Sequence, residues 1–200
     1  MRSLRKTIKI IICETKLKMI RNKYNFCSIC GYPLQKNGRH KSCTNGRCSF
    51  VNYWNPRPTS TAIVVHNGKI LLTKRKKEPC KNCWDLPGGF VDYGENPEKA
   101  LRREMREELG LRELKKPEIL GIYADTYADK EESYHVNCVI YVVKIDNARE
   151  IKIADKEELS AYKWSSFKNI NIKKIAFASN QTALRDFMKY IKTKNGNKKH

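Results

Sequence analysis

The sequence predicts an α/β fold with a small cysteine-rich segment in front of it. Three patterns support this prediction: a β-hairpin at 59–74, an amphipathic helix at 97–109, and two cysteine pairs between positions 27 and 48. A chain of 200 residues is long enough for one ordinary domain and a small appendage. Its hydrophobic content of 40% and charged content of 31% are typical of a globular protein.

Hydropathy gives no reason to expect a membrane partner. No stretch approaches the roughly 20 consecutive apolar residues that a membrane span requires. The apolar run Ile8–Cys13 is interrupted by Lys9, and further lysines follow it without a small-residue cleavage site. We therefore do not interpret this run as a signal peptide, and we expect a cytoplasmic protein.

The net charge of +20 is concentrated near the N-terminus. The first sixty residues contain thirteen Lys/Arg and a single acidic residue, Glu14, so +12 of the charge lies before Thr61. A basic surface accelerates encounters with polyanions such as nucleotides and nucleic acids. Weak nucleic-acid contact is therefore one expectation, and a lysine-rich solvated surface without such a partner is the other.

Composition divides the chain into four parts. We expect a basic N-terminal arm at 1–23, a cysteine-rich segment at 24–54, the main domain at 55–193 and a basic tail at 194–200. The sequence Asn55-Pro56-Arg57-Pro58 indicates a linker, because its prolines interrupt regular structure.

The main domain begins with a hairpin pattern. Thr59–Val65 and Lys69–Lys74 are predicted strands, and Asn67-Gly68 between them is a strong signal for a two-residue turn. The following segment, Arg75–Gly94, is rich in Lys, Pro and Gly, so we predict a loop there.

A helix is predicted at Pro97–Leu109. Asn96 is a suitable N-cap, proline is favoured at the first helical position, and Gly110 suits the position after the last turn. Its apolar stripe consists of Leu101, Met105 and Leu109. The later predicted elements are strands at Ile119–Asp125, Val136–Ile145 and Tyr162–Trp164 and a final helix from about Asn180.

The cysteine-rich segment has the spacing of a structural zinc site. Cys27-x2-Cys30 and Cys43-x4-Cys48 supply four thiols in two short turns. Four thiolates complete a tetrahedral Zn²⁺ shell and leave no open position for catalysis. A metal also stabilises a segment that is too short to bury a core of its own. We therefore predict a zinc ribbon at 24–54, with disulfides or unliganded thiols as the alternatives.

The remaining cysteines give weaker signals. Cys80-x2-Cys83 has no second pair nearby in the sequence, so we favour free thiols there over an accessory metal or a redox bridge. Cys13 and Cys138 occupy ordinary apolar positions.

Three acidic residues are neighbours on one face of the predicted helix. Glu104, Glu107 and Glu108 have the i, i+3 and i+4 spacing that brings side chains together. Three ionised carboxylates so close repel one another, and a bound divalent cation reverses that repulsion. Oxygen ligands of this kind suit Mg²⁺ or Mn²⁺. An exposed helix of mixed charge is the alternative interpretation, because arginines alternate with these glutamates.

The spacing around this helix is far more specific than the helix itself. Gly89 is followed after five residues by Glu95, and after seven more by Arg103-Glu104-Met105-Arg106-Glu107-Glu108-Leu109-Gly110-Leu111. This pattern resembles the Nudix box at every defined position, and Trp84–Val91 is similar to the usual approach to that box. The resemblance extends from Thr59 to Ile191 and is most specific over 84–111.

The resemblance implies an α/β/α sandwich with a mixed sheet, and metal-dependent hydrolysis of a nucleoside diphosphate linked to another moiety. It implies that Glu104, Glu107 and Glu108 hold Mg²⁺ or Mn²⁺, joined by the Gly88 carbonyl. Arg103 would orient a glutamate by pairing with Glu95. The proposed phosphate loop is Gly88-Gly89, where glycines let the backbone approach phosphate.

The general base is less defined by the resemblance, because family members draw it from the box helix or from an acid on a later loop. We rank Glu107 and Glu104 first. The loop candidates are Asp125, Asp129, Glu131 and Glu132.

Substrate identity depends on residues outside the box. A zinc ribbon before the domain is similar to the NADH pyrophosphatase group, but Ile122–Asp129 departs from the Ser-Gln-Pro-Trp-Pro-Phe-Pro stretch of that group. The later region instead resembles ADP-ribose pyrophosphatase-like members. Tyr123, Tyr127 and Phe177 are candidates for stacking on a base, with packing in the sheet as the alternative.

Two further hypotheses remain open. The basic ribbon could bind RNA or DNA, which would make the main domain a ligand sensor or an RNA-end processor. The ribbon could also mediate contacts in a homodimer. The expected partners are therefore a nucleotide-sugar or dinucleotide substrate, with nucleic acid or a second copy as additional possibilities.

Overall fold

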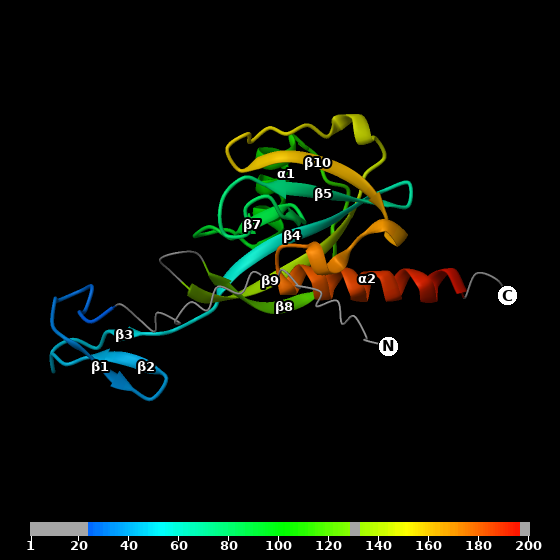
Figure 1. Ribbon diagram of the computed structural model, residues 1–200. Coiled ribbons are helices and arrows are strands. Elements are labelled where there is room, and N and C mark those ends of the chain that lie inside the picture. Colours follow the sequence, from blue (N-terminus) through cyan, green and yellow to red (C-terminus); the bar gives the residue numbers. More distant parts are fainter. Residues whose placement is uncertain (1–23, 129–132, 197–200) are drawn as a thin grey trace, which may run out of the picture.

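A computed structural model of the chain describes residues 24–128 and 133–196, and its main domain is a seven-stranded sheet with one long helix on each face (Figure 1). The path of the sheet is β10-β5-β4-β9-β8, with β6 paired to β5 and β7 paired to β4. Its strands are β4 (Arg57–His66), β5 (Lys69–Arg75), β6 (Trp84–Asp85), β7 (Gly88–Phe90), β8 (Glu118–Ala128), β9 (Ser133–Lys144) and β10 (Leu159–Ser166). The helices are α1 (Pro97–Leu109) and α2 (Ala178–Gly196), with short 3-10 turns at Ala148–Glu150, Phe167–Asn169 and Ile172–Lys174.

The sheet is mixed because β4 and β9 run parallel, whereas the other pairs are antiparallel. β4 is central and alternates its side chains between the two faces, as a strand must. Ala62 and Val64 pack in the core under α1, with Leu101, Met105 and Leu109 of that helix. Ile63 packs in the second core, with Leu184 and Phe187 of α2. The predicted α/β/α sandwich with a mixed sheet is therefore confirmed.

The ends of α1 lie where the sequence places them. The Asn96 side chain accepts a hydrogen bond from the Lys99 backbone N–H (2.8 Å), and Pro97 is the first helical residue. Gly110 has φ +68°, and the N–H groups of Gly110 and Leu111 bond back to the last turn. These caps fix the helix, and with it the direction of its glutamates.

The predicted loop at Arg75–Gly94 is wrong in part, because it contains β6 and β7. Both strands are only two or three residues long, and they form by pairing with β5 and β4 rather than from a local pattern. The predicted linker is also shorter than expected, because β4 already begins at Arg57 and Pro58 is paired with β9. At the other end α2 continues to Gly196, beyond the expected start of the tail.

The cysteine-rich segment forms a separate three-stranded sheet in the order β1-β2-β3, with strands β1 (Leu34–Asn37), β2 (His40–Cys43) and β3 (Val51–Asn52). This small sheet precedes β4 in the sequence and projects away from the main domain (Figure 1). The basic arm at 1–23 and the loop acids Asp129, Glu131 and Glu132 lie outside the described residues. Within the described part of the chain, no helix is both long and apolar enough to cross a bilayer.

A glycine is required where β7 meets β4. Gly88 has φ +141°, and a Cβ placed there would lie 2.2 Å from the Ser60 carbonyl oxygen. We predict that Gly88→Ala lowers the free energy of unfolding by about 3 kcal/mol or more, because backbone strain and the clash add.

Urea unfolding measures this loss. The matched control is Gly94→Ala, where φ is +82° but nothing lies within 4 Å of the new Cβ. The control should lose only about 1–2 kcal/mol through backbone strain. Equal losses in the two variants would contradict the role of the close approach.

Candidate active site

The N-terminal part of the box, β7, is joined to α1 by a buried carboxylate. Glu108 is 6% exposed, and its Oε2 accepts a hydrogen bond from the Gly88 backbone N–H at 3.0 Å. Burial raises the pKa of Glu108 well above its usual range, and the nearby Glu104 charge adds to that effect. One hydrogen bond does not compensate the negative charge of a buried carboxylate, whereas a nearby cation can.

Glu104 is a partly buried carboxylate on the same helix. Its side chain is 12% exposed and packs directly against Gly89, where a Cβ would lie 2.4 Å from Glu104 Oε1. Burial raises its pKa too, although the neighbouring Arg103 opposes the shift. The glycine pair thus has a packing reason as well: Gly88 admits the Ser60 backbone, and Gly89 admits Glu104.

Arg103 connects the glutamates of the box. Its Nε and Nη2 donate to the two oxygens of Glu95, each at 3.0 Å, and Nη1 donates to Glu104 (2.7 Å) and Glu107 (3.1 Å). Nη2 also donates to the Phe90 carbonyl at 2.9 Å, which ties the helix to β7. The two-point pair with Glu95 lowers the pKa of that carboxyl, so both groups stay charged.

Glu107 is different from its two neighbours. Its side chain is 48% exposed, and it contacts Arg103 and, at 3.9 Å, Arg106. The structure therefore buries Glu108, partly buries Glu104, and leaves Glu107 exposed to water.

Glu158 faces the same cluster and was missed in the sequence. It lies in the turn before β10, and its charge raises the pKa of both Glu104 and Glu108. It also lines the cavity beside Glu108. The residue is about fifty positions from the box, so neither helical spacing nor motif could indicate it.

Of the loop acids considered as a general base, Asp125 has a structural role instead. Its Oδ2 accepts a hydrogen bond from the Ser179 backbone N–H at 2.7 Å, at the start of α2. An acid in this position stabilises a helix N-terminus.

A cavity of about 240 Å³ opens beside the glutamates. Gly88, Gly89, Glu108 and Glu158 form one part of its wall. Other parts come from strands of the sheet and from the start of α2, including Arg75, Asp85, Tyr127, Phe177 and Asn180. The cavity therefore combines acidic, aromatic and polar groups from distant parts of the chain.

Two buried polar side chains form a pair in this cavity. Asn180 Nδ2 donates to Asp85 Oδ1 at 2.7 Å, and Asp85 also accepts from the Leu86 backbone N–H. Burial raises the pKa of Asp85 to about 6, although the Arg75 guanidinium opposes the shift. Because the Asn180 amide donates to a carboxylate, its Oδ1 is directed elsewhere. That oxygen is buried and has no hydrogen-bond partner among the described residues.

Aromatic rings form a further part of the wall. Tyr127 is stacked with Phe177 (centroids 5.8 Å apart) and with Tyr134 (5.4 Å), and Phe90 meets it edge-on. The Arg75 guanidinium lies over the Phe177 ring. Of the three predicted stacking residues, Tyr127 and Phe177 line the cavity. Tyr123 does not, because its ring packs against the α2 core and its hydroxyl contacts Asp186.

Comparison with known proteins decides the family. The family model described as the NUDIX domain matches residues 56–187, which include the whole sheet of the main domain and α1. The chain belongs to the Nudix family. The resemblance seen in residues 84–111 is thereby confirmed.

Individual Nudix proteins are also similar to it. An ADP-ribose pyrophosphatase of Methanocaldococcus jannaschii is 34% identical over 144 residues, which cover 72% of this chain and 78% of the relative. The nucleoside triphosphatase NudI of Escherichia coli is 44% identical over 112 residues, covering 51% and 76%. A solved MutT Nudix hydrolase of Burkholderia pseudomallei has a TM-score of 0.57 at 30% identity, covering 66% and 98%. The chain is a Nudix hydrolase, and its relatives differ in their named substrates.

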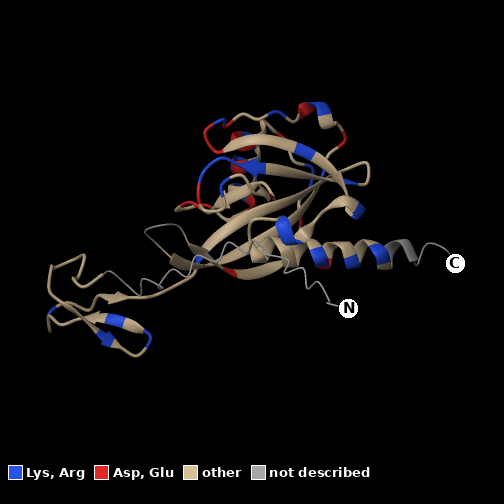
Figure 2. Cartoon of the chain, in the orientation of Figure 1, with Lys and Arg blue, Asp and Glu red and all other residues tan. Residues whose placement is uncertain are grey.

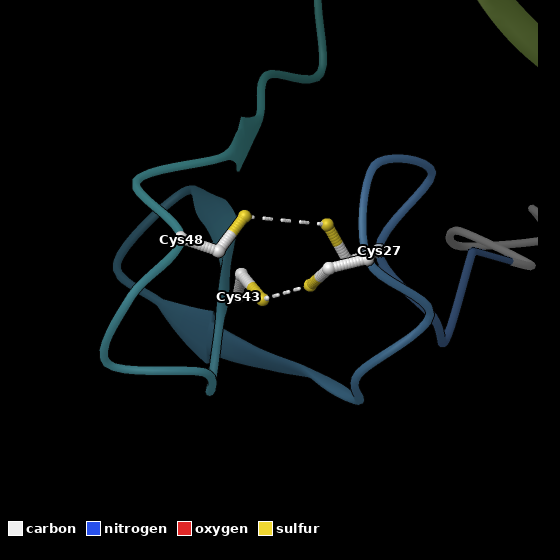
Figure 3. Close-up of side chains that lie close together, drawn as sticks. Cys27, Cys43 and Cys48 are labelled. Carbon is white, nitrogen blue, oxygen red and sulfur yellow. Dashed lines mark hydrogen bonds between the residues drawn. The ribbon is translucent and has the colours of Figure 1, made fainter.

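The four cysteines in front of the Nudix domain come together as the spacing indicates (Figure 3). The thiols of Cys27, Cys30, Cys43 and Cys48 all lie within 4.8 Å of one another, and this set could hold a metal ion. The sulfur pairs are 3.8 Å apart for Cys27–Cys48 and 3.4 Å for Cys30–Cys43, and none of the four forms a disulfide. A hydrogen bond from the Tyr32 backbone lowers the pKa of Cys30 to about 7, whereas burial raises the pKa of Cys43 to about 12.

The burial of Glu108 predicts an unusual effect on stability. A carboxyl whose pKa is raised by folding binds a proton in the folded state over a pH range in which the unfolded chain has released it. For the metal-free protein, the Glu108 contribution to stability is therefore present at low pH and is lost as pH rises from about 4.5 through the raised value. We predict that Glu108→Gln raises the melting temperature of the metal-free protein at neutral pH.

Thermal unfolding followed from pH 5 to pH 8 measures this effect. Glu98→Gln is the control, since Glu98 is exposed and paired with Arg102 on the same helix. A lower melting temperature for Glu108→Gln than for wild type across the range would show that the buried carboxylate is not under electrostatic strain.

Proposed function

We propose that this Nudix hydrolase cleaves the pyrophosphate bond of a nucleoside diphosphate derivative of the ADP-ribose type, with Mg²⁺ or Mn²⁺ as the catalytic ion. The cavity carries the proposal, because Glu108 and Glu158 line it together with an aromatic and polar wall, and the Glu104 charge lies close enough to act on Glu108. Acidic groups suit the metal that accompanies a diphosphate, and the aromatic wall suits a base.

The residues present fit a divalent cation. Glu108 is buried and Glu104 is partly buried on the same helix. Desolvation raises the pKa of both carboxyls, and the Glu104 charge raises that of Glu108 further. We assign the metal to Glu104, Glu107 and Glu108, with Glu158 as an additional ligand. When bound, the ion neutralises phosphate charge and makes a coordinated water more acidic.

The protein's own groups then have separate tasks. Arg103 holds Glu95, Glu104 and Glu107 in place through four hydrogen bonds, so its role is positioning. Glu107 is the exposed carboxylate of the set and is our choice for accepting the proton of the attacking water. Water adds to one phosphorus, the bridging oxygen leaves with the other half, and the products from ADP-ribose are AMP and ribose 5-phosphate.

The other part of the cavity is suited to a base that carries an amino group. The Tyr127 ring contacts both Phe177 and Phe90, so an apolar wall is formed before a ligand enters. The free Asn180 Oδ1 accepts a hydrogen bond, and adenine offers the N6 amino group as donor. The likeness to an ADP-ribose pyrophosphatase supports this choice of substrate.

For the cysteine cluster we propose a structural Zn²⁺. Four thiols from two turns supply the complete tetrahedral set, which leaves no position for substrate. The ribbon sheet has strands of two to four residues, so metal removal with a chelator should unfold this segment.

Replacement of the glutamates tests the reaction directly. We predict that Glu107→Gln and Glu108→Gln each lower kcat for ADP-ribose hydrolysis by at least about a hundredfold, because each removes charge at the metal or the proton acceptor. The assay follows AMP release with Mg²⁺ and with Mn²⁺. Glu98→Gln, on the same helix but outside the cavity, should retain wild-type kcat. Activity near that of wild type in both site variants would refute the assignment.

A substrate pair tests the base pocket. ADP-ribose and its inosine counterpart differ at C6, where an amino group is replaced by a carbonyl. We predict that wild type prefers ADP-ribose by at least about tenfold in kcat/KM, since an unpaired buried acceptor costs on the order of 1–3 kcal/mol. In Asn180→Leu the preference should disappear. A preference that persists in the variant would place the amino group elsewhere.

A further inference from the structure

The zinc ribbon exposes an unusual number of large apolar side chains. Five aromatic residues between positions 24 and 54 are at least 44% exposed, and Ile29 is 72% exposed. The five are Tyr24, Phe26, Tyr32, Tyr53 and Trp54. Single exposed apolar residues are ordinary, but so many within about thirty residues point to a partner.

The Nudix domain does not cover this surface. The ribbon projects away from the mixed sheet, and the rings remain exposed in the presence of every described residue (Figure 1). The proposed metal at the four cysteines would account for the fold of the ribbon, yet it would not account for rings that face water.

The charge of the ribbon identifies the kind of partner. Residues 24–54 contain four cations and no acidic residue, and the cations lie on the β1–β2 hairpin and its surroundings (Figure 2). They are Lys36, Arg39, Lys41 and Arg47. Lys41 supports the hairpin by donating to Tyr24 O and Asn25 Oδ1, and the other three are available to solvent.

We propose that the ribbon binds single-stranded nucleic acid, with its aromatic rings stacking on bases and its cations contacting phosphates. Rings and cations together are the combination that such ligands require, because every base has an exposed face once it is unpaired. The phosphates account for the one-sided charge. This proposal is independent of the substrate assigned to the Nudix site.

Two other occupants fit the surface less well. Duplex nucleic acid would satisfy the cations but leave the rings without a partner, because paired bases are stacked on one another. A second copy of the ribbon would cover the rings but bring together eight cations without an acidic group. Single-stranded nucleic acid satisfies both features.

The test uses the full-length, zinc-loaded protein and a fluorescent twelve-nucleotide RNA of mixed sequence, with anisotropy as the readout. Tyr32→Ala and Trp54→Ala remove rings without changing charge. Each should weaken binding by at least about tenfold, and the slope of binding against salt should stay unchanged. Zinc content and the melting temperature, measured alongside, confirm that the variants are folded.

The matched control is Tyr190→Ala on α2, where the ring is 44% exposed, as Trp54 is. It should bind RNA as wild type does. The result that overturns the proposal is equal affinity of wild type, Tyr32→Ala and Trp54→Ala, because binding would then depend on charge alone. Equal affinity for the duplex form of the same RNA overturns it as well. A change of oligomeric state in Trp54→Ala without loss of RNA binding would instead assign the rings to a second copy.

Discussion

The architecture of the site depends on two neighbouring carboxylates of α1, of which Glu108 is buried and Glu104 is partly buried. Glu104 and Glu108 lie within one turn of α1, and both are largely withdrawn from water. Such an arrangement opposes folding unless neighbouring groups compensate. Arg103 does so for Glu104 through a direct hydrogen bond, and the Gly88 N–H does so for Glu108. We propose that a divalent cation offsets the remaining cost of withdrawing these two charges from water.

Much of the surrounding structure follows from that constraint. Gly89 is a glycine because the Glu104 carboxyl occupies the place of a side chain. The apolar stripe of α1 packs in the core, and the caps fix both ends of the helix. Glu104 and Glu108 therefore face β7, where they contact Gly89 and Gly88. Arg103 is held in turn by Glu95 and by the Phe90 carbonyl, so the loop before the helix is part of the same arrangement. The glycines, the glutamates and Arg103 of the box therefore hold one another in position.

The sequence predicts this part well because its contacts are local. The i+3 and i+4 spacing of Glu104, Glu107 and Glu108 follows from helix geometry, and the caps of α1 are adjacent in the chain. Glu158 and the Asp85–Asn180 pair were not predictable, since they meet the site only through long-range pairing. β6 and β7 were not predictable either, because these short strands form only by pairing with β5 and β4. Tyr123 and Tyr127 lie four residues apart on β8, where strand alternation gives both the same face, so their pattern could not show that Tyr127 lines the cavity whereas Tyr123 packs in the α2 core.

Binding of Mn²⁺ is the most direct test of whether Glu104 and Glu108 form a cation site. Electron paramagnetic resonance of the zinc-loaded protein, titrated with Mn²⁺, counts the ions bound and gives their affinity. We expect saturable binding in wild type, and a loss of at least about tenfold in affinity in Glu104→Gln/Glu108→Gln, since two charges are removed from the ion's surroundings. Equal Mn²⁺ affinity in the two proteins, or no binding in wild type, would contradict this expectation.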